Sequence, residues 1–326
     1  MKCMAILVPR NGGPDVLEYA EIDVPPPGPG EVQIRHVAIG LNYIDTYFRS
    51  GLYPAPNGFP YIAGEEGAGT IIAVGPDTGE FREGDRVAYP ASSGAYAEVR
   101  NISVSQLVKV PDDISLETAA GMMMKGMTAE YLLNRTYKVG SDTVLLFHAA
   151  AGGVGLIAGQ WAKALGATVI GTAGGAAKVA LARKHGYDHV IDYNSDNFVE
   201  RVKDITGGKG VDVVYDSVGR DTYPASLDCL KPRGLWVSFG QSSGAIDPLK
   251  ISILAQKGSL YATRPTIFSY IRDRKELDDC ANAVFSVVQS NKVIININQT
   301  YPLADAARAH DDLEKRKTSG TTLLIP

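Results

Sequence analysis

The feature that most constrains the fold is an apolar strand pattern that runs directly into a glycine-rich turn and then into a helix pattern. Residues 144–149 read VLLFHA, the turn reads AAGGVG over 150–155, and apolar residues then recur at helical spacing. Gly152 allows close approach of a pyrophosphate, Gly155 allows close packing of helix against strand, and the helix N-terminus offers N–H groups to phosphates. The segment therefore predicts a dinucleotide-binding turn.

Five further apolar runs alternate with helix patterns in the same part of the chain. The six expected strands are 144–149, 168–173, 189–193, 211–218, 235–240 and 260–263. Such alternation is typical of a doubly wound parallel sheet with helices on both faces. A glycine triplet alone is also compatible with a simple tight turn, but a strand before it and a helix after it favour the binding interpretation. Ser195 is expected to cap one of the helices.

The flanking parts have a different pattern. Residues 1–125 contain short Val- and Ile-rich runs separated by Gly and Pro roughly every ten residues, which predicts a β-rich domain. The tail predicts a helix over 274–289, a strand over 292–297, a helix over 303–315 and a strand over 321–325. With 326 residues, we expect a β-rich domain over 1–125, a dinucleotide-binding domain over 126–265 and a C-terminal return to the first domain over 266–326.

Composition excludes several other classes of protein. Thirty-six acidic residues against 32 Lys and Arg give a net charge of −4, which argues against a nucleic-acid-coating surface. The cysteines Cys3, Cys229 and Cys280 lie far apart in the sequence, so we expect no disulfide framework and a cytoplasmic location. No stretch approaches the roughly 18 to 20 apolar residues of a membrane helix.

The end of the second expected strand indicates which dinucleotide binds. Sites for NAD usually place an Asp or Glu there to bind the ribose hydroxyls. Here the strand ends at Thr172 and Ala173 and the chain continues as GGAA to Lys178, without a carboxylate. A lysine can neutralise a 2′-phosphate that an acid would repel, so the pattern predicts NADPH. In the alternative interpretation, Lys178 is simply a solvated helix residue.

Segments spread over nearly the whole chain resemble the zinc-independent NADPH:quinone oxidoreductases, the ζ-crystallin-like family of the medium-chain dehydrogenase/reductase superfamily, and its bacterial members in particular. They are GLNYIDTY at 40–47, GEEGAG at 64–69, GDRV at 84–87, residues 147–161, YDSVG at 215–219, GSLY at 258–261 and RP at 264–265. The resemblance implies an α/β protein with a GroES-like β-rich catalytic domain and a Rossmann domain with a six-stranded parallel sheet. It also implies NADPH-dependent quinone reduction and a homodimer formed through Rossmann sheet edges.

The resemblance assigns roles to individual residues. The cofactor-binding residues, with the glycines of the turn included, would be Asn42, Asp45, Thr128, Ala150, Gly152, Gly153, Val154, Gly155, Thr172, Lys178, Tyr193, Ser217, Phe239, Gly240, Arg264 and Arg316. Asn42 and Asp45 would lie beside the nicotinamide ribose. Tyr47 and Tyr53 would border the quinone pocket, although surface packing explains each tyrosine equally well. None of these residues stands out as a general acid or base.

Zinc is not expected. Zinc dehydrogenases of the same superfamily need an early thiolate ligand, a Gly-His-Glu segment and a four-cysteine lobe, whereas Glu65 stands here in the place of that histidine. His148 falls inside an expected buried strand and is interpreted as a core histidine.

Two other functions compete with quinone reduction. An alkenal or enoyl reductase would use the same hydride on an α,β-unsaturated carbonyl and would then need a proton donor. A single-stranded RNA-binding role is disfavoured by the acidic net charge and by the lack of a basic, aromatic-lined groove. A structural, crystallin-like role is expected only as a second use.

Overall fold

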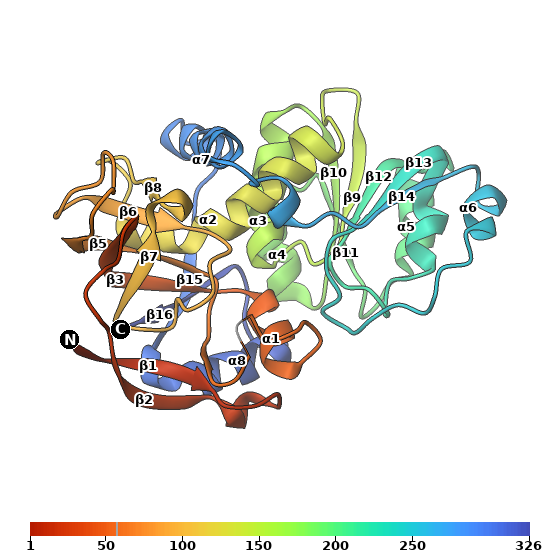
Figure 1. Cartoon of the computed structure of the whole chain (residues 1–326). Coiled ribbons are helices and arrows are strands. Elements are labelled where there is room, and N and C mark those ends of the chain that lie inside the picture. Colours follow the sequence, from red (N-terminus) through yellow and green to blue (C-terminus); the bar gives the residue numbers. More distant parts are fainter. Residues whose placement is uncertain (57) are drawn as a thin grey trace. The chain divides into compact units, whose positions relative to one another are not determined.

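The computed structural model describes residues 1–56 and 58–326, which divide into two compact units (Figure 1). One unit comprises Met1–Met127, Ile271–Gln289 and Ile295–Pro326, and the other comprises Thr128–Tyr270 and Ser290–Ile294. The chain therefore leaves the first unit and returns to it.

The second unit is built on a six-stranded sheet in the order β11-β10-β9-β12-β13-β14. The strands are β9 (Val144–Phe147), β10 (Thr168–Ala173), β11 (His189–Asp192), β12 (Val211–Asp216), β13 (Leu230–Ser238) and β14 (Tyr261–Thr263). All neighbouring strands are parallel. In chain order this arrangement is 3-2-1-4-5-6, which is typical of Rossmann sheets and confirms the predicted doubly wound fold.

Helices connect these strands. They are α3 (Gly153–Ala164), α4 (Ala176–Lys184), α5 (Phe198–Ile205) and the short α6 (Ser252–Gln256). The chain reverses after α3 at Gly166, which has a φ of 89°. The predicted cap of α5 is wrong, because Asn197 accepts hydrogen bonds from the N–H groups of Val199 and Glu200, whereas Ser195 donates to the carbonyl of Asp192.

The first unit contains two β-sheets. One has the order β2-β1-β4; the other has the order β15-β16-β3-β5-β6-β8, with β7 also paired to β3. The strands are β1 (Lys2–Val8), β2 (Glu18–Asp23), β3 (Glu31–Leu41), β4 (Tyr61–Ile62), β5 (Glu66–Val74), β6 (Arg86–Tyr89), β7 (Val99–Ser103), β8 (Val108–Lys109), β15 (Ile297–Pro302) and β16 (Thr321–Ile325). Its β-rich character agrees with the expected GroES-like domain.

The helices of this unit are α1 (Tyr43–Ser50), α2 (Leu116–Glu130, whose last turn enters the second unit), α7 (Arg274–Gln289) and α8 (Ala306–Glu314). The C-terminal β16 pairs antiparallel with β3 and parallel with β15, so the end of the chain completes the larger sheet. Among the described residues, none of the helices combines the length and apolarity that crossing a lipid bilayer requires.

The tail differs from the prediction at one strand. The expected helix 274–289 coincides with α7 and the expected strand 321–325 with β16, but the strand expected over 292–297 is wrong, because β15 begins only at Ile297. The side chain of Gln160 instead binds both backbone groups of Ile294, with N–O distances of 2.9 and 3.1 Å. Ile294 itself is exposed.

Candidate functional site

The glycine turn lies between β9 and α3. Gly152 is the N-cap residue of α3 and supplies no side-chain oxygen to the first N–H groups of the helix. A Cβ at residue 155 would lie 2.4 Å from the carbonyl oxygen of Ala149, so glycine allows the helix to start this close to the turn. The hydroxyl of Tyr187 donates to the carbonyl of Gly155 at 2.7 Å. The uncapped N–H groups and the positive end of the helix dipole suit a phosphate.

A buried polar chain lies next to this turn. The ring nitrogens of His148 lie 2.9 Å from Thr172 Oγ1 and 3.1 Å from Ser226 Oγ, and burial lowers the pKa of this histidine. Ser226 in turn donates to Asp216 at 2.9 Å. The expected core histidine is therefore confirmed. The hydroxyl of Thr172 is engaged in this chain, while its backbone carbonyl accepts from the N–H of Ala150 at 2.9 Å.

The loops after β12 and β13 meet at the same end of the sheet. Asp216, at the end of β12, accepts from the N–H of Gly219 at 3.1 Å, and its carbonyl accepts from the N–H of Phe239 at 2.8 Å. A Cβ at Gly240 would lie 2.7 Å from the carbonyl oxygen of Ser217. The structure thus brings together three predicted cofactor residues, Ser217, Phe239 and Gly240. Arg264 follows β14 and donates to the carbonyl of Ser238 at 2.8 Å.

The loop after β10 carries the residues that were expected to select the dinucleotide. Tyr193 covers this loop, because a Cβ at Gly174 would lie 2.6 Å from its hydroxyl oxygen. Lys178 lies in the first turn of α4 and is half-buried. One acidic residue does reach the loop, since Asp192 accepts from the N–H groups of Gly175 and Asn194 at 2.9 and 3.0 Å. No sequence pattern around the glycine turn indicates Asp192, because it lies at the end of the next strand, β11.

The remaining predicted cofactor residues lie elsewhere. Thr128 is buried at the start of the second unit, whereas Arg316 belongs to the first unit, where it is exposed and has a φ of 58°.

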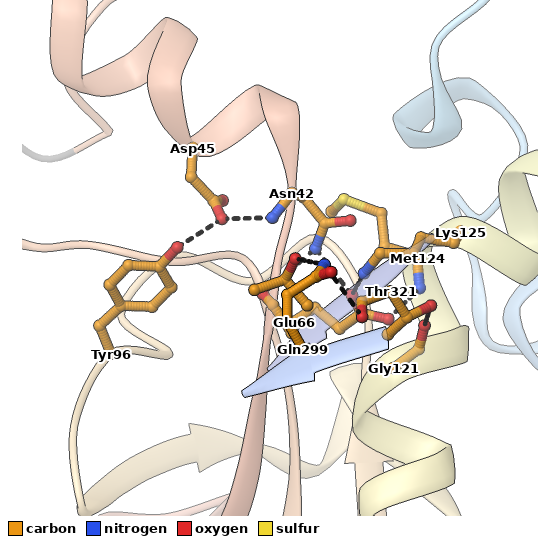
Figure 2. Close-up of polar contacts among 11 residues, drawn as sticks. Asn42, Asp45, Glu66, Tyr96, Gly121, Met124, Lys125, Gln299 and Thr321 are labelled. Atoms are coloured by element: carbon orange, nitrogen blue, oxygen red, sulfur yellow. Dashed lines mark hydrogen bonds and ion pairs between the residues drawn. The ribbon is translucent and has the colours of Figure 1, made fainter. Parts of the chain in front are cut away.

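In the first unit, Asn42 caps α1 and leads into a buried ion pair (Figure 2). Its side-chain amide donates to Glu66 Oε2 at 2.7 Å, and Lys125 Nζ lies 2.9 Å from the same oxygen. The other oxygen of Glu66 accepts from the N–H of Met124 at 2.7 Å. A Cβ at Gly40 would lie 2.3 Å from Glu66 Oε2, so glycine makes room for this carboxylate.

A second polar chain begins at Asp45, whose Oδ2 accepts from the N–H of Asn42 at 2.9 Å and from the hydroxyl of Tyr96 at 2.8 Å (Figure 2). The hydroxyl of Tyr96 also lies 3.1 Å from His310 Nε2, and Arg49 lies 3.0 Å from His310 Nδ1. These side chains come from distant parts of the sequence and carry no local motif, so the sequence analysis missed Tyr96, His310 and Arg49.

Burial shifts the titration of this region. Desolvation raises the pKa of Asp45 to about 7, and desolvation together with the charge of Asp45 raises the pKa of Glu65 to about 8. Desolvation and the neighbouring charge of Arg49 lower the pKa of His310 to about 3, so this histidine is neutral at physiological pH.

Aromatic rings cluster along α1 and just beyond it. The ring centroids of Tyr47 and Tyr53 are 5.3 Å apart in an edge-to-face arrangement, and the ring of Tyr43 lies 5.7 Å from that of Tyr47. The N–H of Tyr53 donates to the carbonyl of Tyr47 at 3.0 Å. The structure therefore brings the two predicted pocket tyrosines into contact. Over the residues that the structure describes, no group of three or more His, Cys, Asp and Glu side chains is arranged to hold a metal ion.

Comparison with known proteins places this architecture. Residues 28–141 match the family described as alcohol dehydrogenase GroES-like domain, and residues 153–283 match the family described as zinc-binding dehydrogenase. A quinone oxidoreductase of Pseudomonas aeruginosa is 52% identical to this chain over 97% of both proteins. The chain belongs to the quinone oxidoreductase family.

Two other members of the wider superfamily are similar over nearly their full length. The structure of Escherichia coli quinone oxidoreductase complexed with NADPH superposes with a TM-score of 0.97 at 51% identity, covering 99% of this chain and 100% of that chain. A 2-haloacrylate reductase of a Burkholderia species is 44% identical over 99% of both chains. The quinone oxidoreductase family therefore accounts for both compact units of the fold.

Proposed function

We propose that this chain reduces quinones with NADPH. The observation that carries the proposal is the uncapped N-terminus of α3 at the glycine turn, within a chain that is 52% identical to a quinone oxidoreductase over 97% of its length. NADPH supplies a hydride from its nicotinamide ring. The first turn of α3 would bind the pyrophosphate, and the loops bearing Ser217 and Gly240 would line the cofactor site beside it.

The preference for NADPH rests on the loop after β10. Lys178 and Tyr193 are the residues proposed to bind the 2′-phosphate. The Oδ1 atom of Asp192 accepts two backbone N–H groups, so this carboxylate holds the loop in place. A charge-assisted hydrogen bond to a phosphate contributes ~1.5 to 3 kcal/mol.

In the first unit, Asn42 and Asp45 are proposed to lie beside the nicotinamide ribose, with Thr128 near the carboxamide and Arg264 and Arg316 along the cofactor. Tyr47 and Tyr53 are proposed to border the acceptor, because their edge-to-face rings offer apolar faces to a planar quinone. These residues mainly position the two reacting rings, which can account for a large part of a hydride-transfer rate.

Steady-state oxidation of NADPH with 1,4-benzoquinone tests the proposal, with NADH as the matched alternative donor. We expect turnover with NADPH and a much lower kcat/KM with NADH. Equal kcat/KM for both donors would refute the cofactor assignment, and no turnover with any quinone would refute the function.

Reduction of an activated alkene is a second candidate, favoured by the 44% identity to a 2-haloacrylate reductase. It needs the same hydride, and in addition a proton on carbon. Rates on 1,4-benzoquinone and on a simple enone, measured under the same conditions, separate the two activities.

The reaction is proposed to need no zinc. Glu65 and Asn42 stand where the sequence of a zinc dehydrogenase would place ligands, and both contact other groups of this chain, Ser93 and Glu66. Elemental analysis should find no stoichiometric zinc, and activity should survive a strong chelator. One zinc per chain with activity lost on chelation would contradict this.

We also propose a homodimer formed through the β14 edge of the Rossmann sheet. Tyr261 on this strand is 63% exposed, whereas the preceding Leu260 is buried. An unpaired edge strand tends to recruit a partner. Light scattering should give about twice 34.8 kDa, and a monomer mass would reject the dimer. Three free, buried cysteines support a reducing, cytoplasmic location.

A further inference from the structure

Two buried carboxyl groups of the first unit stand apart from the ion pairs of the protein. Asp45 is 4% exposed and Glu65 is 3% exposed, and neither forms an ion pair with any side chain in the described ranges 1–56 and 58–326. An ionised carboxylate without a cation is costly to bury, so such a group tends to keep its proton. The charge of Asp45 also disfavours ionisation of Glu65, and the charge of Glu66 disfavours ionisation of Asp45.

The hydrogen bonds of Asp45 define which oxygen carries that proton. The N–H of Asn42 and the hydroxyl of Tyr96 both donate to Oδ2 (Figure 2). The direction of the Tyr96 bond follows from its neighbours. Arg49 can only donate, so Nδ1 of His310 accepts, its Nε2–H donates to Tyr96, and Tyr96 is left to donate to Asp45.

The hydrogen-bonded series from Arg49 through His310 and Tyr96 orients Asp45. It cannot return a proton to Asp45, because it ends at an arginine, which does not give up a proton. The proton of Asp45 therefore leaves and returns by Oδ1. Among the described residues, Asp45 Oδ1 and the hydroxyl of Tyr61 are the buried side-chain polar atoms without a hydrogen-bond partner. The charge of Asp45 acts on Tyr61, which places the two groups near each other, and a shared water would satisfy both atoms.

We propose that Asp45 Oδ1, by way of the Tyr61 hydroxyl, supplies the proton that follows hydride transfer to an activated alkene. This role rests on the proposed function of the site. It adds a proton donor to a set of residues that otherwise only position cofactor and acceptor.

The reaction balances with one hydride and one proton for each alkene. Hydride from NADPH adds to the β-carbon, and the electron pair of the double bond becomes an enolate. The α-carbon then takes a proton as the O–H bond of Tyr61 breaks, the proton on Asp45 Oδ1 passes to the Tyr61 oxygen, and the resulting Asp45 carboxylate regains a proton from solvent. A quinone instead becomes a delocalised hydroquinone anion, which can take its proton on oxygen from water, so the quinone reaction depends less on Asp45.

Several charged or titratable groups set the proton affinity of Asp45. They are Tyr61, Glu65, Glu66, Tyr96 and Lys125, with Arg49 and His310 one contact further away. Lys125 and the two hydrogen bonds favour the carboxylate, but burial outweighs them and holds the pKa at about 7. A donor with a pKa near the working pH is well matched to general acid catalysis.

The first test is infrared spectroscopy of the full-length protein. At about pH 6 the wild type should show the carbonyl stretch of a protonated carboxyl, which should weaken as the pH passes about 7 and should be missing in Asp45→Asn. This readout does not depend on activity. A wild-type spectrum at about pH 6 without a component that Asp45→Asn removes overturns the proposal.

The second test compares acceptors in the same variants. With a simple enone, Asp45→Asn should lower kcat by about 100-fold and Tyr61→Phe by about 10-fold, and each loss should be several-fold larger than the loss of the same variant with 1,4-benzoquinone, because a positioning effect slows both acceptors alike. The enone rate of the wild type should also fall as the pH rises through about 7. Tyr89→Phe is the control for Tyr61→Phe, because Tyr89 is also a buried tyrosine but its hydroxyl lies 2.7 Å from His36 Nε2 and is thus already engaged.

The outcomes separate this proposal from the proposed function. If the wild type reduces both acceptors and Asp45→Asn keeps its enone rate, the proton donor is refuted while the function stands. Equal losses on both acceptors also refute it, because they indicate a positioning defect. If the wild type fails to oxidise NADPH with either acceptor, both the proposed function and this role of Asp45 are refuted.

Discussion

Lys125 and Glu66 form an ion pair inside the first unit, with Nζ 2.9 Å from Oε2 and side chains that are 6% and 0% exposed. The same Glu66 oxygen also receives the amide of Asn42. The orientation of the residue that caps α1 therefore depends on a buried cation from α2.

Removal of the Lys125 cation should destabilise the protein. Lys125→Met leaves the carboxylate of Glu66 buried without its cation and should lower the free energy of unfolding by about 3 to 5 kcal/mol, as measured by urea denaturation. The double variant Lys125→Met, Glu66→Gln should recover part of this loss. Lys2→Met is the control, because Lys2 and Glu21 form a pair at 2.6 Å that is more than half exposed, and its loss should cost less than about 1 kcal/mol.

Asn42→Ala should lower kcat by similar factors for small and large quinones, up to about 100-fold, because a misplaced ring slows every acceptor alike. Steady-state kinetics over a quinone series measures this. Asn197→Ala removes a helix cap in the second unit and should leave kcat unchanged, although it should cost about 1 kcal/mol of stability. A loss confined to bulky quinones would assign Asn42 to the acceptor pocket instead.

Lys178→Ala should reduce the difference between the affinities for NADPH and NADH. Loss of one charge-assisted contact should weaken NADPH binding by roughly 10- to 150-fold and leave NADH binding almost unchanged, as measured by fluorescence titration. Lys184→Ala, at the other end of α4, is the matched control and should change neither affinity. An equal loss for both dinucleotides would show that Lys178 does not contact the 2′-phosphate.

The titration of Asp45 should contribute to the pH dependence of the free energy of unfolding. Its folded pKa of about 7 lies above the unfolded value, so the native state binds more protons, and this contribution to stability is lost as the pH rises from about 4 to 7. Asp45→Asn should therefore unfold at higher urea than the wild type at about pH 8 and at similar urea at about pH 5. A variant that is less stable at both pH values would contradict an ionised, buried Asp45.

The effect of Asp85→Asn on stability should depend on pH in the opposite direction from that of Asp45→Asn. Although burial disfavours the Asp85 carboxylate, its contact with Lys109 lowers the pKa, so its contribution is present at neutral pH and is lost in acid. The variant should therefore be less stable than the wild type at neutral pH.

Sequence patterns predicted the elements whose signals are local. The glycine turn, the β-strands around it and α7 follow from periodicity and from glycines at fixed spacing. The strand expected over 292–297 failed because its apolar residues resemble a strand, whereas the side chain of Gln160 binds the backbone of Ile294. The chain from Arg49 through His310 and Tyr96 to Asp45 could not be predicted, because 214 residues separate Tyr96 from His310 and only tertiary packing joins them.

The glycines that follow β10 limit how this protein can evolve or be engineered toward the other dinucleotide. The usual change introduces an acid at the end of that strand. A Cβ at Gly174 would lie 2.6 Å from the hydroxyl oxygen of Tyr193, and Gly175 has a φ of 85° that other residues rarely adopt. A substitution at Gly174 therefore requires Tyr193 to move, and a substitution at Gly175 requires a backbone conformation that strains other residues. An acid introduced at Gly174 would thus displace Tyr193, the residue proposed to recognise the 2′-phosphate, so the same substitution would change both sides of the cofactor choice.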